Sequence, residues 1–76
     1  MTAPESRNQA LRDTIWQLFR NGPTWDGNMV SKRYRDECVA AGLVERAEGW
    51  NWLTYSGVTL ALELGMGRDS EKGRLG

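Results

Sequence analysis

The sequence contains no histidine and a single cysteine, Cys38, among its 76 residues. Histidine is the commonest general base near neutral pH and the commonest zinc ligand. One thiol without histidine cannot form a structural zinc site or an intrachain disulfide, and we expect Cys38 to be a small buried hydrophobe. The acidic residues are interspersed with arginines, as on a solvated surface. We therefore expect no enzyme activity, no metal site and no cofactor.

Net charge is also missing, because ten Lys and Arg residues balance ten Asp and Glu residues. A nucleic-acid-binding protein is usually basic, since contacts with phosphates supply much of its affinity. This balance argues against DNA binding unless the cations gather on one face. There is no apolar run long enough to span a membrane and no signal-peptide pattern. We therefore expect a cytoplasmic protein that does not bind membranes.

A chain of this length forms one small domain, which we place at residues 6–65. Residues 1–5 are predicted to be a disordered arm, and residues 66–76, rich in glycine and charge, a disordered tail. Ser6 and Gln9 can form a capping box for a first helix from about Arg7 to Arg20. The apolar residues of that helix share one stripe and comprise Leu11, Ile15, Leu18 and Phe19.

The segment from Thr24 to Val30 is too short for a full second helix. It is predicted to hold a short strand at Thr24-Trp25 and a single turn opened by Asp26. A further helix should follow over Lys32–Ala41, capped by Ser31 and ended by Gly42. Helical periodicity predicts a buried stripe of Val30, Tyr34, Cys38 and Ala41, and an exposed face carrying Lys32, Arg35 and Asp36, with Arg33 at its edge.

A hairpin is predicted next, with strands at Leu43–Arg46 and Trp50–Leu53 and a turn at Glu48-Gly49. A two-residue turn would pair Ala47 with Trp50 and Glu45 with Trp52, whereas a three-residue loop would reverse which side chains face the core. With the two-residue turn, the core face carries Val44, Arg46, Asn51 and Leu53. We expect Trp52 to be buried, while for Trp50 both burial and an exposed aromatic patch remain open.

The last helix is predicted over Tyr55–Leu64, capped by Thr54 and stopped by Gly65. One stripe of this helix carries Tyr55, Val58, Ala61 and Leu62, and Leu60 and Leu64 lie on the other side. A short chain cannot easily cover both sides of its last helix. Leu60 and Leu64 are therefore candidates for a homodimer contact, unless the first helix covers them.

Two stretches carry a resemblance to a known fold: Gly42-Leu43-Val44-Glu45-Arg46 and Leu53-Thr54-Tyr55-Ser56-Gly57. Their order resembles the second half of a winged helix-turn-helix domain, as in MarR-like regulators and small phage-encoded proteins. The resemblance implies a mostly helical α+β fold with about three helices and a wing sheet of two or three strands. The short segment after Pro23 departs from the family pattern, which has a full helix there.

The first hypothesis for function is a phage or bacterial transcriptional regulator that binds double-stranded DNA as a dimer. The contacting residues would be Ser31, Lys32, Arg33 and Arg35 at the start of the second long helix. The alternative is that these cations simply solvate the helix.

The second hypothesis is a winged helix that binds and inhibits a host protein, as some small phage-encoded proteins do. Neutral charge, the shortened segment after Pro23 and surplus tryptophans favour it. The partner would contact the wing at Glu48, Gly49 and Trp50, because exposed aromatic residues are usual anchors of protein interfaces.

Overall fold

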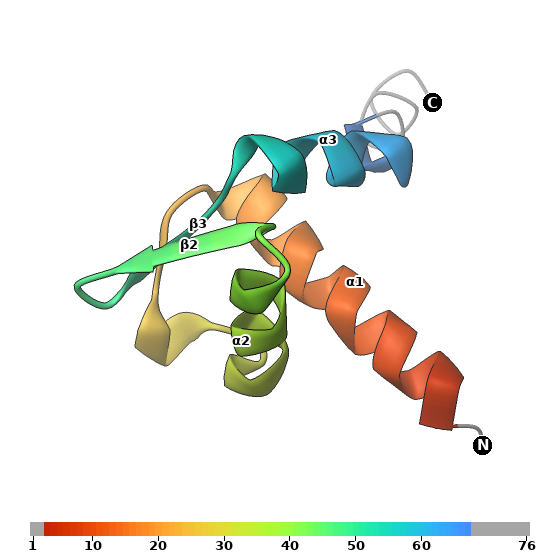
Figure 1. The fold of residues 1–76 in the computed structure, drawn as a ribbon, viewed down its shortest axis with the longest axis horizontal. Helices are drawn as coiled ribbons and strands as arrows, with labels where there is room; N and C mark the ends of the chain where they lie inside the picture. The colour runs from red at the N-terminus through yellow and green to blue at the C-terminus, as the bar shows by residue number, and fades with distance from the viewer. Residues whose placement is uncertain (1–2, 68–76) are drawn as a thin grey trace.

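The computed structural model of the protein describes residues 3–67, with side chains from residue 7 onward. Three helices and a three-stranded antiparallel sheet give the predicted α+β class in a winged-helix-like layout. The elements follow in the order α1 (Ala3–Asn21), β1 (Thr24–Trp25), the 3₁₀ turn η1 (Asp26–Asn28), α2 (Lys32–Ala40), β2 (Val44–Ala47), β3 (Trp50–Leu53) and α3 (Tyr55–Glu63), as seen in Figure 1.

Helix α1 begins at Ala3, four residues before the predicted start. Residues 3–5, predicted to belong to a disordered arm, are therefore helical, and Ser6 lies inside the helix and cannot cap it. Proline is well tolerated in the first turn of a helix, where its missing N–H has no partner anyway. Pro4 thus permits the early start that the capping-box prediction missed.

The C-terminal boundary also differs from the prediction. Helix α3 ends at Glu63, and Gly65 adopts a φ of 87°, as its predicted stop requires. Met66 then lies in a further helical turn and is only 4% exposed, so the predicted tail is wrong at its first residue. Gly67 belongs to the same helical turn, and the rest of the predicted tail, residues 68–76, lies outside the described residues.

The short strand and turn after Pro23 are confirmed. β1 pairs antiparallel with β3, with Thr24 opposite Asn51 and Trp25 opposite Trp50, so the sheet order is β1-β3-β2. The single turn η1 stands where a winged helix usually has a full helix. The backbone N–H of Asp26 donates to the carbonyl of Gly49 at 2.8 Å, which joins this turn to the tip of the hairpin.

The register of the β2–β3 hairpin is also as predicted, with Ala47 opposite Trp50 and Glu45 opposite Trp52. Both residues of the connecting turn have positive φ, 51° at Glu48 and 85° at Gly49. Two left-handed residues in a two-residue loop match the twist of the flanking strands. The local turn therefore fixes which side chains face the core.

The predicted caps of α2 and α3 are both present. The Ser31 hydroxyl accepts a hydrogen bond from the Tyr34 N–H at 3.1 Å, and the Thr54 hydroxyl accepts one from the Gly57 N–H at 3.0 Å. Gly57 is required by a close approach, since a Cβ there would lie 2.1 Å from the Leu43 carbonyl oxygen. This contact seats the start of α3 against the start of β2.

The core lies where α1 meets the inner face of the sheet and the other two helices. The predicted α1 stripe is largely confirmed, with Leu11 and Phe19 partly buried against the core. The fully buried apolar residues are Ile15, Leu18, Met29, Cys38, Val44, Ala61 and Met66. In the described part of the chain, no helix has the length and apolar character needed to cross a membrane.

The predicted buried stripe of α2 is wrong at both ends, because Val30 is 60% exposed and Ala41 is also exposed. The side chain of Gln17 explains the first error. Its Nε2 donates to the Asn28 carbonyl at 2.7 Å and its Oε1 accepts from the Val30 N–H at 2.9 Å. These two bonds fix the backbone on both sides of Met29, which enters the core in place of Val30.

The core assignment can be tested by comparing Leu18→Ala with Leu62→Ala. Leu18 is 2% exposed and Leu62 is 53% exposed, so the two variants remove the same atoms from different environments. We expect Leu18→Ala to lower the free energy of unfolding by about 2–5 kcal/mol, as for other large-to-small core changes. Leu62→Ala should change it by less than about 1 kcal/mol. Urea unfolding measures both, and equal losses would contradict this description of the core.

Candidate functional site

The start of α2 carries two free cations of the predicted DNA-contacting set. Lys32 and Arg33 are exposed, as predicted, and Ser31 is partly buried because it caps the helix. The Arg33 guanidinium lies 5.3 Å from the centre of the Tyr34 ring. Neither cation forms an ion pair with a carboxylate among residues 7–67.

Arg35, the fourth predicted DNA contact, is not on the exposed face. It is 6% exposed, and its Nη1 donates to the Asp26 carboxylate at 2.9 Å and to the Asn51 side-chain oxygen at 3.1 Å. Its Nε donates to Asp36 at 2.6 Å. The prediction of an exposed Arg35 is therefore wrong. Helical periodicity alone placed this arginine outside, and it could not anticipate acceptors supplied by the 3₁₀ turn and by β3.

Asp26 is the centre of this polar cluster. Arg46 donates to both of its carboxylate oxygens, with Nε 3.0 Å from Oδ1. The side-chain amide of Asn51 donates to Asp26 at 2.8 Å and to the Thr24 carbonyl at 3.0 Å. Hydrogen bonds from Arg46 and Asn51 hold the pKa of Asp26 well below its usual range. Among the described residues, every buried side-chain nitrogen and oxygen has a partner.

One sequence signal pointed toward this cluster. The hairpin parity placed Arg46 and Asn51 on the face of the sheet that looks toward the core. Polar groups on such a face need hydrogen-bond partners. Asn51 is indeed fully buried. What the sequence could not identify was the partner, because Asp26 lies 20 residues or more away along the chain.

The outer face of the sheet carries three tryptophans. Trp25, Trp50 and Trp52 share this face because Trp25 lies opposite Trp50 and successive side chains on β3 alternate. Trp25 and Trp50 are 47% and 46% exposed, so the open question about Trp50 is settled in favour of exposure. Trp52 is partly buried rather than fully covered.

Trp25 and Trp50 pack edge to face, with ring centroids 5.4 Å apart and an interplanar angle of 65°. Trp25 also packs against the hairpin turn, since a Cβ on Gly49 would lie 2.4 Å from its ring. Glycine at this position is therefore required twice, by its positive φ and by the indole. These contacts hold two half-exposed aromatic rings in fixed positions beside the wing tip.

An apolar groove of about 410 Å³ continues from Trp52 toward the end of α1 and the start of α3. Its wall includes no charged residue and is formed by Leu18, Phe19, Gly22, Pro23, Trp52, Leu53 and Val58. The outward stripe of α3 carries Tyr55 (89% exposed), Val58 (37%) and Leu62 (53%).

The predicted dimer residues Leu60 and Leu64 are not on that outward stripe. Both are partly buried against the core and line a cavity of about 320 Å³ together with Leu11 and Ile15 of α1. Of the two alternatives for these leucines, the structure shows the one in which the first helix covers them, and they are not an exposed dimer stripe. Both sides of α3 are apolar, so periodicity could not decide which one α1 covers. Gly57 and Ala61, which allow close packing, lie on the buried side.

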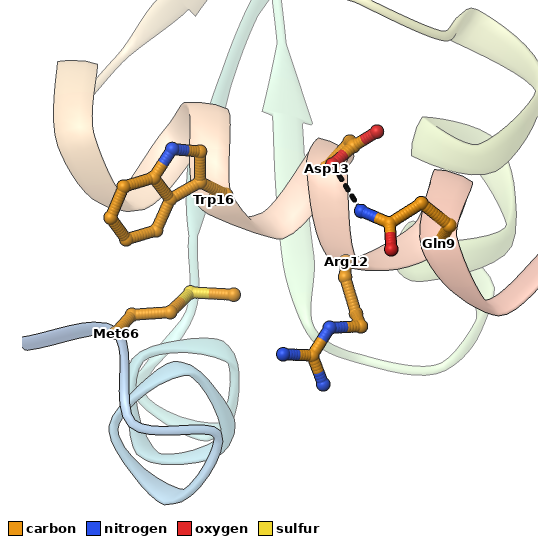
Figure 2. A pocket seen from close by; sticks show the side chains of 5 residues that line it. All are labelled: Gln9, Arg12, Asp13, Trp16 and Met66. Carbon is orange, nitrogen blue, oxygen red and sulfur yellow. Dashed lines mark hydrogen bonds between the residues drawn. The ribbon is translucent and has the colours of Figure 1, made fainter. Parts of the chain in front are cut away.

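Two other features carry no assigned function. A small hollow of about 180 Å³ is lined by Gln9, Arg12, Asp13, Trp16 and Met66, and Gln9 donates to Asp13 there at 2.8 Å. Figure 2 shows Trp16 beside Met66 in this hollow. Cys38 is 1% exposed, and burial raises the pKa of its thiol. A thiol that is covered and protonated is a poor nucleophile.

Comparisons of this chain with protein-family models, with curated proteins and with solved structures found no match. The geometry of the chain itself is therefore the basis on which its function is inferred.

The polar cluster can be tested with two substitutions that each remove one acidic partner of Arg35. Asp26→Asn should lower the urea midpoint at pH 7 clearly, because the buried Arg35 and the partly exposed Arg46 both lose their charged acceptor. Asp36→Asn is the matched control, since the Asp36 side chain is 71% exposed and its ion pair is screened by water. If both variants unfolded at the same urea concentration, Asp26 would have no special role.

The ion pairs of Asp26 also predict how the stability of the protein depends on pH. The pKa of Asp26 is lowered in the folded protein, so its contribution to stability is fully present above the unfolded-chain value of about 3.9. That contribution is lost as the pH falls below about 4 toward the folded-state pKa. The difference in urea midpoint between the parent and Asp26→Asn should therefore shrink from pH 5 to pH 2. A difference that grows on acidification would contradict the assignment.

Proposed function

We propose that this chain is a winged-helix protein whose function is to bind another protein through the outer face of its sheet. The observation that carries this proposal is the exposed pair Trp25 and Trp50, each about half exposed on one sheet face. Tryptophan is enriched among the residues that dominate binding energy in protein interfaces. Rings that are already fixed by packing lose little side-chain entropy when a partner covers them.

The distribution of cations supports protein binding over DNA binding. Arg35 and Arg46 are both engaged by Asp26, and the wing tip carries Glu48, which would repel a phosphate backbone. Phosphate contacts supply much of the affinity of DNA-binding proteins. Lys32 and Arg33 are the only members of the predicted DNA-contacting set that remain free cations in the described residues.

Binding to double-stranded DNA is the second candidate, and Lys32 and Arg33 at the exposed start of α2 are the observation in its favour. A phage or bacterial regulator would place this end of α2 in the major groove. Neutral net charge would then require a dimer or a partner to gain affinity.

The partner-binding face can be tested by affinity capture from a bacterial lysate, with and without nuclease. The parent should retain a defined protein after nuclease treatment, and Trp50→Ala should lose it. Tyr55→Ala is the matched control, because it removes another exposed aromatic ring that belongs to α3 and not to the sheet. Capture that survives Trp50→Ala, or that disappears with nuclease, would contradict binding through the tryptophan face.

DNA binding makes a separate prediction on a heparin or DNA column at low salt. If DNA is the ligand, replacing Lys32 and Arg33 with alanine should weaken binding. It should also flatten the salt dependence, by about one unit of slope for each phosphate that the variant no longer neutralises. If the parent protein is not retained on either column, DNA binding is contradicted and protein binding remains the proposed function.

A further inference from the structure

The outer face of the sheet is acidic as well as aromatic. Glu45 lies directly opposite Trp52 in the antiparallel pair, and opposite residues project to the same side of a sheet. Glu48 occupies the turn next to Gly49, against which the Trp25 ring packs. Both glutamates are exposed, and neither forms an ion pair within residues 7–67.

Arg46, the cation of the β2–β3 hairpin, projects to the face of the sheet opposite Glu45. Arg46 alternates with Glu45 along β2 and donates to the Asp26 carboxylate. The polar cluster thus removes positive charge from the wing and leaves the two glutamates beside the tryptophans without a neutralising partner among the described residues.

Tryptophan faces and carboxylates attract the same chemical group. A guanidinium or ammonium ion is drawn to the electron-rich face of an indole, and tryptophan is the strongest of the aromatic side chains in this respect. Arginine can stack on a ring and donate hydrogen bonds to a carboxylate at once. An acidic segment, or a nucleic-acid backbone, would meet repulsion from Glu45 and Glu48.

We propose that the outer face formed by Trp25, Trp50, Trp52, Glu45 and Glu48 binds an arginine-containing, basic segment of a partner protein. This inference rests on the proposed function, since it names the chemistry of the partner for the same face. The guanidinium lies over the Trp25–Trp50 pair, and the two glutamates neutralise the arginines of the segment.

The test measures fluorescence anisotropy of dye-labelled eight-residue peptides that alternate glycine with arginine, citrulline or glutamate. Citrulline keeps the shape of arginine but removes its charge. We expect the arginine peptide to bind the full chain, the citrulline peptide to bind more weakly and the glutamate peptide not to bind. Binding of the arginine peptide should weaken as salt is raised from low concentration, because exposed charges are screened.

Variants locate the site. Trp50→Ala should weaken binding of the arginine peptide by about two- to thirtyfold, which is the range for one cation–π contact. The double variant Glu45→Gln, Glu48→Gln should also weaken binding of the arginine peptide by about two- to thirtyfold. Glu63→Gln is the matched control, since it neutralises an exposed acid on α3 and should leave affinity unchanged. Circular dichroism checks that each variant is folded.

Three outcomes would overturn the proposal: no binding of the arginine peptide at low salt, equal binding of all three peptides, or equal losses in Glu63→Gln and the Glu45–Glu48 variant. A parent that dimerises in sedimentation, dissociates with Trp50→Ala and binds no peptide would assign this face to a second copy. If the arginine peptide does not bind but capture from lysate still depends on Trp50, the proposed function stands and only the inference of a basic partner is overturned. If neither peptide binding nor Trp50-dependent capture is observed, the inference and the proposed function are both overturned.

Discussion

The interaction on which the structure depends is the hydrogen-bonded ion pair between the buried Arg35 of α2 and the partly buried Asp26 of the turn η1, with Asn51 of β3 as the third member. A winged helix usually fills this place with a second helix, but the chain supplies only one turn here. A buried guanidinium is costly unless charged and polar groups satisfy it. Asp26 and Asn51 satisfy the Arg35 guanidinium. Their hydrogen bonds with it join η1, α2 and β3, which are distant in sequence.

The position of the wing follows from that cluster. Because Asp26 is held by Arg35 from one side and by Arg46 from the other, η1 is joined both to α2 and to the hairpin. The Asp26 N–H also donates to the Gly49 carbonyl, which places Trp25, the preceding residue, against the hairpin turn. A partly buried polar cluster on one face of the sheet thereby holds an exposed aromatic pair on the other.

The parts of the fold that depend on neighbouring residues could be predicted from the sequence. The two-residue turn at Glu48-Gly49 sets the strand register, and the caps at Ser31 and Thr54 set the start of two helices. The burial of Arg35 could not be predicted, because the acceptors that draw it inward, Asp26 and Asn51, lie 9 and 16 residues away and an arginine on a helix is usually exposed. Which face of α3 is buried could not be predicted for another reason: leucines occupy both sides, and only the packing of α1 decides between them.

The zero net charge of the chain conceals an uneven distribution of charge. Arg35 of α2 and Arg46 of β2 turn toward Asp26, whereas Glu45 and Glu48 remain at the outer surface of the hairpin. A wing that approaches phosphates needs the opposite arrangement, with its cations outward and its acids neutralised. Since the same ion pairs that stabilise the shortened segment also withdraw the cations, stability and surface chemistry are linked in this chain. This arrangement of charge supports the proposal of a basic protein segment, rather than DNA, as the partner of the hairpin.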